Sequence, residues 1–235
     1  MKILRRLAQE LKNLTYEVTS SFQIPKGRTH FDVPYVCQFS IPENAEPTLK
    51  KTLVPVEDPE WAASGATSPK RYSDWAFTMC GMASTAMILD YFLNSKLLPA
   101  VLAEDALLHQ VYTNESASIS DMRYRQYVTW VSNQGLRATF YTRLSVRGLE
   151  HALTNGKLAI VSVNPNIRGF DTAPLTQKGG HLVVVTGYDL NDKTITINNP
   201  SGFSSSNTQH HHKLPLEVFE KYYAGRGIIL SARQE

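Results

Sequence analysis

The sequence has few cysteines, little charge bias and no long hydrophobic run. Two cysteines in 235 residues are too few for a disulfide scaffold, and no group of Cys and His residues has the spacing of a structural zinc site. We therefore expect reduced thiols, with no metal and no cofactor. The 24 Lys and Arg residues against 21 Asp and Glu residues leave a net charge of +3, which predicts no nucleic-acid partner.

The lack of a hydrophobic run also bears on location. The N-terminal sequence "MKILRRLAQELKNL" interrupts its leucines with charged residues, which predicts neither a signal peptide nor an integral membrane segment. We expect a cytoplasmic protein. Leucines recur here at alternating steps of three and four, which predicts an amphipathic helix over residues 3–14. We expect this helix to pack on the body of the protein; contact with a membrane surface is the alternative.

Secondary-structure patterns divide the chain into two parts. Residues 1–30 form a helix and a linker, and residues 31–235 form a domain. Residues 41–73 are rich in proline and acidic residues without periodicity, and predict a long loop insertion. Helices dominate the first half of the domain and strands the second, which predicts an α+β fold of two lobes. The expected helices are 79–92, 121–134, 146–156 and 215–223, and the expected strands are 31–39, 137–142, 158–163, 181–189, 194–198 and 227–232.

Cys80 begins the apolar stretch "CGMASTAMILDYF". A thiol in the first turn of a helix lies near unpaired N–H groups and the positive end of the helix dipole, which favour the thiolate. The pattern therefore favours a nucleophile, although free cysteines are also common as small buried side chains. Cys37, next to Gln38, is expected to fill the core, with a redox partnership with Cys80 as the alternative.

His181 follows Gly179 and Gly180 at the start of the strand "HLVVVTGYD". A histidine at the mouth of a strand can act as a base, and two glycines allow a substrate backbone to approach closely. Asn199 ends the next strand, 18 positions later, so a hairpin would bring the two side chains together. Its neighbour Asn198 should point to the opposite face and tolerate alanine.

The order Cys, His, Asn resembles that of the papain-like cysteine peptidases. The segments "DVPYVCQF", "CGMASTAMILDYF", "GGHLVVVTGYD" and "ITINNPSG" more narrowly resemble the bacteriocin-leader, or double-glycine, peptidase family and its stand-alone relatives. The resemblance covers about residues 30–230 and implies a papain-like fold with Cys80 as nucleophile, His181 as general base and Asn199 as orienting residue. It also implies that the Gln38 side chain and the Cys80 N–H donate to the oxyanion.

Two features depart from that family. Its orienting residue is usually an aspartate before the proline, whereas this chain has Asn199. In the leader peptidases the glutamine lies only a few residues before the cysteine, whereas Gln38 and Cys80 are 42 positions apart, 80 minus 38. The segment between them contains Trp61 and Trp75, which either line the cleft or anchor a surface loop.

The leading functional hypothesis is hydrolysis of a peptide or amide bond through a covalent acyl-enzyme, with a peptide or protein as substrate. Gly179, Gly180 and Trp75 are the expected substrate-binding residues. An acyl transferase or peptide ligase with the same triad and a non-catalytic peptide-binding module are the alternatives. The triple histidine at 210–212 has no companion carboxylate in sequence, and its side chains should diverge, so no metal site is predicted there.

Overall fold

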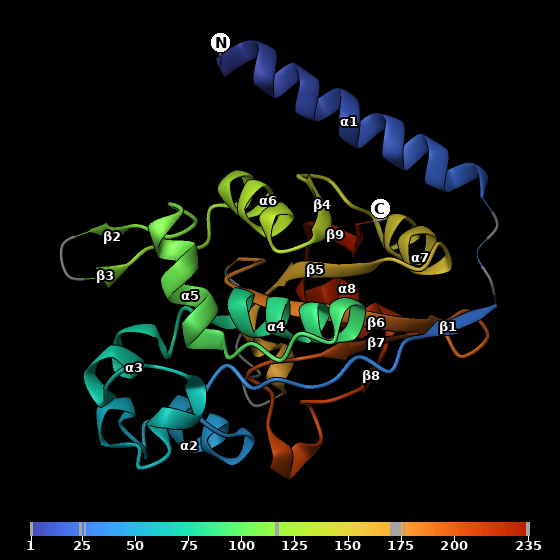
Figure 1. The fold of residues 1–235 in the computed structure, drawn as a ribbon. Helices are drawn as coiled ribbons and strands as arrows, with labels where there is room; N and C mark the ends of the chain where they lie inside the picture. The colour runs from blue at the N-terminus through green and yellow to red at the C-terminus, as the bar shows by residue number, and fades with distance from the viewer. Residues whose placement is uncertain are drawn as a thin grey trace.

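An antiparallel sheet forms the second half of the chain in the computed structural model, which describes residues 2–23, 25, 27–115, 118–169, 175 and 177–233 (Figure 1). Its order is β4-β9-β5-β6-β7-β8, and β1 also pairs with β6. The strands are β1 Arg28–His30, β4 Leu136–Tyr141, β5 Leu158–Val163, β6 His181–Asp189, β7 Thr194–Asn198, β8 His212–Pro215 and β9 Tyr223–Ala232; β2 Asn114–Glu115 and β3 Ser118–Ile119 form a separate pair.

Helices precede the sheet along the chain and cover it. The helix α4 Cys80–Leu93 packs on β5, β6 and β9, and its residues from Gly81 to Leu89 are all buried. Every residue of β5 is buried as well, so the core lies where α4 meets the centre of the sheet. The predicted α+β fold is confirmed. The remaining helices are α1 Lys2–Phe22, α2 Ala45–Leu49, α3 Pro69–Trp75, α5 Pro99–Leu108, α6 Tyr124–Asn133, α7 Val146–Thr154 and α8 Leu216–Tyr222.

The N-terminal helix α1 extends well beyond the predicted 3–14 and lies along the outside of the molecule, beside α7 and β4 (Figure 1). The helix packs on the body, as expected. It does so through its polar face, whereas the leucine pattern indicated the apolar face. Leu4, Leu7, Leu11 and Leu14 are 58–71% exposed, whereas Gln9 and Asn13 are buried. The reason is that these two amides hydrogen-bond to β4 and the residue after it.

Two predictions for the segment before α4 are wrong. Residues 31–39 form no strand: β1 ends at His30, and an extended stretch containing Pro34, which has no N–H for a ladder, follows it. Residues 41–73 are not a long loop but a series of short helical segments, two of which, 3₁₀ helices, begin at Pro42 and Pro55. Each segment is too short to show a helical periodicity in the sequence.

The sheet predictions were more accurate. The hairpin of β6 and β7 across residues 190–193 is confirmed, and β5 has the predicted bounds. The helix expected at 121–134 begins only at Tyr124. In the described part of the chain no single helix is both long and apolar enough to cross a bilayer; α3 and α4 pass that test only as a pair, bent by 95°.

Candidate active site

A cavity of about 240 Å³ lies between the start of α4 and the start of β6. Cys80 and His181 both line it, because α4 packs directly on β6. The structure therefore brings together the two residues that the sequence nominated for thiol chemistry. The complete lining consists of Phe77, Thr78, Cys80, Asp121, Met122, Tyr124, Ser162, Gly180, His181, Leu182 and Arg226.

Cys80 stands at the first position of α4, and its sulfur lies against the backbone of β6. The backbone amides of Leu182 and Gly81 both act to lower the pKa of its thiol. A Cβ at Gly81 would lie 2.7 Å from the Met122 sulfur and 3.2 Å from the Tyr112 hydroxyl, so any larger residue would force the Met122 side chain to shift. The glycine after the cysteine thus allows the cavity wall to close around the thiol.

His181 is oriented by the hairpin that carries it. Its Nε2 lies 2.8 Å from Oδ1 of Asn199, an oxygen that only accepts hydrogen bonds. Nε2 therefore carries the proton, and Nδ1 holds the lone pair that a general base needs. The Ser201 hydroxyl lies 3.0 Å from the same Nε2, and the Ser201 N–H donates to Asn199 Oδ1 at 3.2 Å.

Arg168, at the end of a 3₁₀ turn over Pro165–Arg168, extends this network. Its Nε donates to the Ser201 hydroxyl at 2.8 Å and to the Ser201 carbonyl at 3.1 Å. The guanidinium is buried, which lowers the pKa of Arg168 to about 10 and leaves it charged at neutral pH. Sequence reasoning missed Arg168 and Ser201; Ser201 was signalled only by its place two residues after Asn199.

The electrostatic surroundings favour a neutral resting pair. Burial raises the pKa of Cys80, opposed by the Leu182 amide, the Arg168 charge and the Gly81 amide. Burial, followed by the Arg168 charge, lowers the pKa of His181 well below 6.5, and the Asn199 hydrogen bond opposes this shift. At neutral pH the site therefore holds a thiol beside a neutral imidazole, rather than a preformed ion pair.

Gln38 and Trp75 are not among the residues that line the cavity. Gln38 is 2% exposed, its N–H donates to the Pro200 carbonyl at 2.7 Å, and its Nε2 donates to the Ala76 carbonyl at 2.8 Å. This fixes its amide beside the segment that leads to Cys80. Trp75, expected to bind substrate, is instead fully buried in the core, where its Nε1 donates to Glu104 at 2.8 Å.

The two glycines before His181 have backbone conformations that other residues rarely adopt. Gly179 has φ +105° and Gly180 has φ +99°. A Cβ on Gly179 would lie 2.6 Å from Nη2 of Arg226 and 3.0 Å from the Ser162 hydroxyl. Gly180 lines the cavity directly, whereas Gly179 lets the chain pass close to Arg226.

Cys37 lies in the core. It is 7% exposed, its sulfur accepts the Phe39 N–H at 3.3 Å, and burial raises the pKa of its thiol to about 12. Cys37 and Cys80 are both free thiols in the structure.

The histidine segment and Asn198 differ from expectation. The rings of His210 and His211 converge, with centroids 3.8 Å apart, and His211 Nε2 lies 3.2 Å from the Asp32 carboxylate. Ligand atoms of these three residues lie within 4.8 Å of one another, a possible geometry for a metal that the sequence did not suggest. Asn198 is fully buried and bonded to the Val33 carbonyl and to the His211 N–H, so we now expect alanine at this position to destabilise the protein.

Comparisons with known proteins bear on the family and the fold of the chain. A family model described as "Peptidase_C39 like family" matches residues 50–228, and no curated protein matches the sequence. A putative C39-like peptidase from Bacillus anthracis is 18% identical over 89% of this chain and 100% of that one, with a TM-score of 0.53, and shares the fold. A double glycine motif protease from an AMS/PCAT transporter, solved with a leader peptide, is 21% identical over 67% of this chain and 86% of that one, with a TM-score of 0.44.

Proposed function

Because the chain belongs to the Peptidase_C39-like family, we propose that it hydrolyses peptide bonds with Cys80 as nucleophile, His181 as general base and Asn199 as orienting residue. The observation that carries this proposal is the 2.8 Å bond between His181 Nε2 and Asn199 Oδ1, in the wall of the cavity that Cys80 also lines. A pure binding module has no need of a thiol matched with an oriented base.

The reaction begins with proton transfer from the Cys80 thiol to His181 Nδ1 as the sulfur attacks the peptide carbonyl. The tetrahedral intermediate collapses with cleavage of the C–N bond, and the imidazolium gives its proton to the departing amine. His181 then takes a proton from water, which attacks the thioester. The C–S bond breaks, the acid leaves, and the proton returns to the sulfur.

The positive charge that lowers the pKa of the Cys80 thiol comes from Arg168, whereas the orienting residue Asn199 is uncharged. Asn199 fixes the ring of His181 but cannot stabilise an imidazolium by charge. Arg168 acts on the other partner, because its positive charge lowers the pKa of the Cys80 thiol. The buried guanidinium therefore supports the thiolate as it forms.

For the oxyanion we propose two donors, the Cys80 N–H and the Gln38 side chain. The Gln38 amide gives one N–H to the Ala76 carbonyl, which leaves its second N–H for a substrate. Removing one such donor costs on the order of 10²–10³ in kcat. A Gln38→Ala variant is expected to show this loss, and an unchanged kcat would exclude the role.

A thiol-directed epoxysuccinyl peptide probe, followed by peptide mapping, tests the proposal. We expect the label on Cys80, its loss in Cys80→Ala together with all turnover, and its retention in Cys37→Ser. Labelling of Cys37 alone would contradict the proposal. Product analysis with an added amine nucleophile separates hydrolysis from acyl transfer, since a transferase would give the amide and little free acid.

A further inference from the structure

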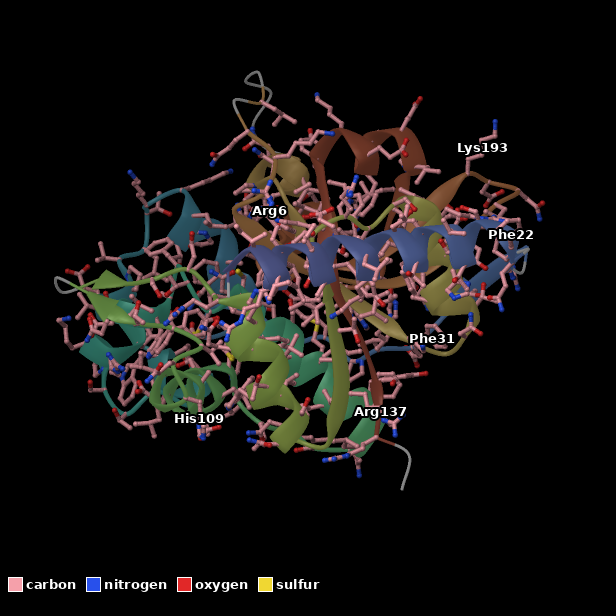
Figure 2. All side chains as sticks on the ribbon, turned by 90° about the horizontal axis from the view of Figure 1, so that it is seen from above. Arg6, Phe22, Phe31, His109, Arg137 and Lys193 are labelled. Carbon is pink, nitrogen blue, oxygen red and sulfur yellow. The ribbon has the colours of Figure 1, made fainter. Side chains whose placement is uncertain are left out.

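The helix α1 exposes a continuous apolar stripe. At about 100° per residue its apolar side chains fall within an arc of roughly 100°. All of them are between 48% and 84% exposed, although the helix lies on a folded body with a large core. Figure 2 shows α1 running over the face of the molecule from Arg6, near the middle of the view, to Phe22 at its right edge. The apolar stripe consists of Ile3, Leu4, Leu7, Leu11, Leu14, Val18 and Phe22.

Polar bonds on the opposite face hold α1 in this orientation. Gln9 Nε2 donates to the Phe140 carbonyl at 3.0 Å, and Asn13 exchanges two hydrogen bonds with Thr142, at 2.5 and 3.2 Å. The Tyr16 hydroxyl donates to the Gly148 carbonyl at 2.9 Å. Turning the apolar stripe inward would break all of these bonds, so the outward face is built into the fold.

The charges on α1 are sorted in the same way. Its acidic residues are engaged by the body: Glu10 pairs with Arg143, and Glu17 accepts the Ser145 N–H at 2.9 Å. Arg5, Arg6 and Lys12 are exposed, and no ion pair joins them to a carboxylate of the described residues. Helix geometry places them roughly 120–140° from the centre of the apolar stripe, on both sides of it.

An exposed apolar stripe, on a helix that also carries three unpaired cations on its polar side, matches the surface of a bilayer with anionic headgroups. Long Arg and Lys side chains reach headgroups while a neighbouring apolar face inserts about 5–10 Å into the interface. We propose that α1 is a membrane-surface anchor that lies flat on an anionic bilayer and holds the body of the protein there.

Vesicle co-flotation of the full chain tests this anchor. We expect binding to phosphatidylcholine vesicles that contain phosphatidylserine and much weaker binding to phosphatidylcholine alone. The variant Leu7→Gln with Leu11→Gln and Leu14→Gln should bind at least about tenfold more weakly to the mixed vesicles. Leu108→Gln is the matched control, because Leu108 is 82% exposed on another helix. This control variant should bind the vesicles as the parent does.

A second triple variant, Arg5→Gln with Arg6→Gln and Lys12→Gln, should lose the preference for phosphatidylserine. Equal binding by the parent and the leucine variant, or no binding by the parent, would overturn the proposal. So would a dimer in sedimentation that the leucine variant abolishes, with no vesicle binding. Probe labelling of Cys80 without vesicles should be equal in all these variants, so the anchor and the peptidase proposal can fail separately.

Discussion

Polar side chains are buried around His181, whereas apolar side chains are exposed along α1. Asn199 and Ser201 are fully buried and hydrogen-bonded, while Leu7 and Leu11 on α1 are more than 60% exposed. Both regions reverse the usual distribution of polarity in a folded protein. Exceptions to the usual burial of apolar and exposure of polar side chains occur most often at functional sites. Both regions therefore point to function. If this is correct, substitutions around His181 should affect catalysis, whereas substitutions in the apolar stripe should leave catalysis and folding intact.

Among the substitutions that test this comparison, the largest effect is expected at Asn199. Asn199→Ala removes the acceptor that holds His181 Nε2, so kcat should fall about 10²-fold, a part of what general acid–base catalysis contributes. Binding of a substrate-like inhibitor should change little, because the cavity keeps its walls. Steady-state kinetics with inhibitor titration measure both quantities. A loss of inhibitor binding equal to the loss of kcat would instead indicate that the cavity itself collapses.

The conservative variant Asn199→Asp sharpens that result. A carboxylate at 199 would keep the hydrogen bond and raise the pKa of His181 by its negative charge. His181 must be neutral to act as the base, so a higher pKa protonates it at a higher pH. The acid limb of the pH–rate profile should therefore move upward, while much of the activity remains.

Asn198 should behave differently from its neighbour. Its side chain joins the N-terminal extended segment to the loop before β8, through the Val33 carbonyl at 2.9 Å and the His211 N–H at 2.9 Å. Asn198→Ala leaves both partners without this bond, which should lower the free energy of unfolding by about 1–3 kcal/mol. Urea denaturation measures this change. A catalytic defect in a variant of normal stability would contradict a structural role.

These two asparagines also show which parts of the site could be predicted from the sequence. The hairpin of β6 and β7 was predictable because each strand has a local pattern, and the hairpin placed Asn199 beside His181. The hydrogen bond of Asn198 could not be predicted, because its partner Val33 is 165 positions away. Arg168 was missed for the same reason, since its bond to Ser201 spans 33 positions and leaves no local signal.

The helix α1 shows the complementary limit. The spacing of its leucines correctly predicted a helix, because periodicity is a property of one segment. Periodicity does not reveal whether the apolar face meets the protein or something outside it. That outcome was decided by the polar face, whose amides find partners on β4 and just beyond it. Neither partner is signalled by the helix itself.

A smaller effect is expected at Arg168. Its charge lowers the pKa of Cys80 and the pKa of His181, so Arg168→Gln should raise both. A rise of one pKa unit in the thiol would lower its rate of alkylation at neutral pH about tenfold. Iodoacetamide labelling across a pH series measures this. Arg226→Gln, at the arginine that lines the cavity, is the control and should leave the thiol pKa unchanged. The reverse pattern would exclude Arg168 as the relevant charge.

The smallest effect is expected in the apolar stripe itself, and it separates the two faces of α1 most directly. Leu11 is 66% exposed, so Leu11→Gln should change the free energy of unfolding by no more than about 0.5 kcal/mol. Asn13 is 1% exposed and bonded twice to Thr142, so Asn13→Leu should cost about 1–3 kcal/mol although it makes the helix more apolar. A helix held by its leucines would give the opposite ranking. Urea unfolding of the two variants distinguishes these cases, because only a helix bound through its polar face tolerates the loss of a leucine better than the gain of one.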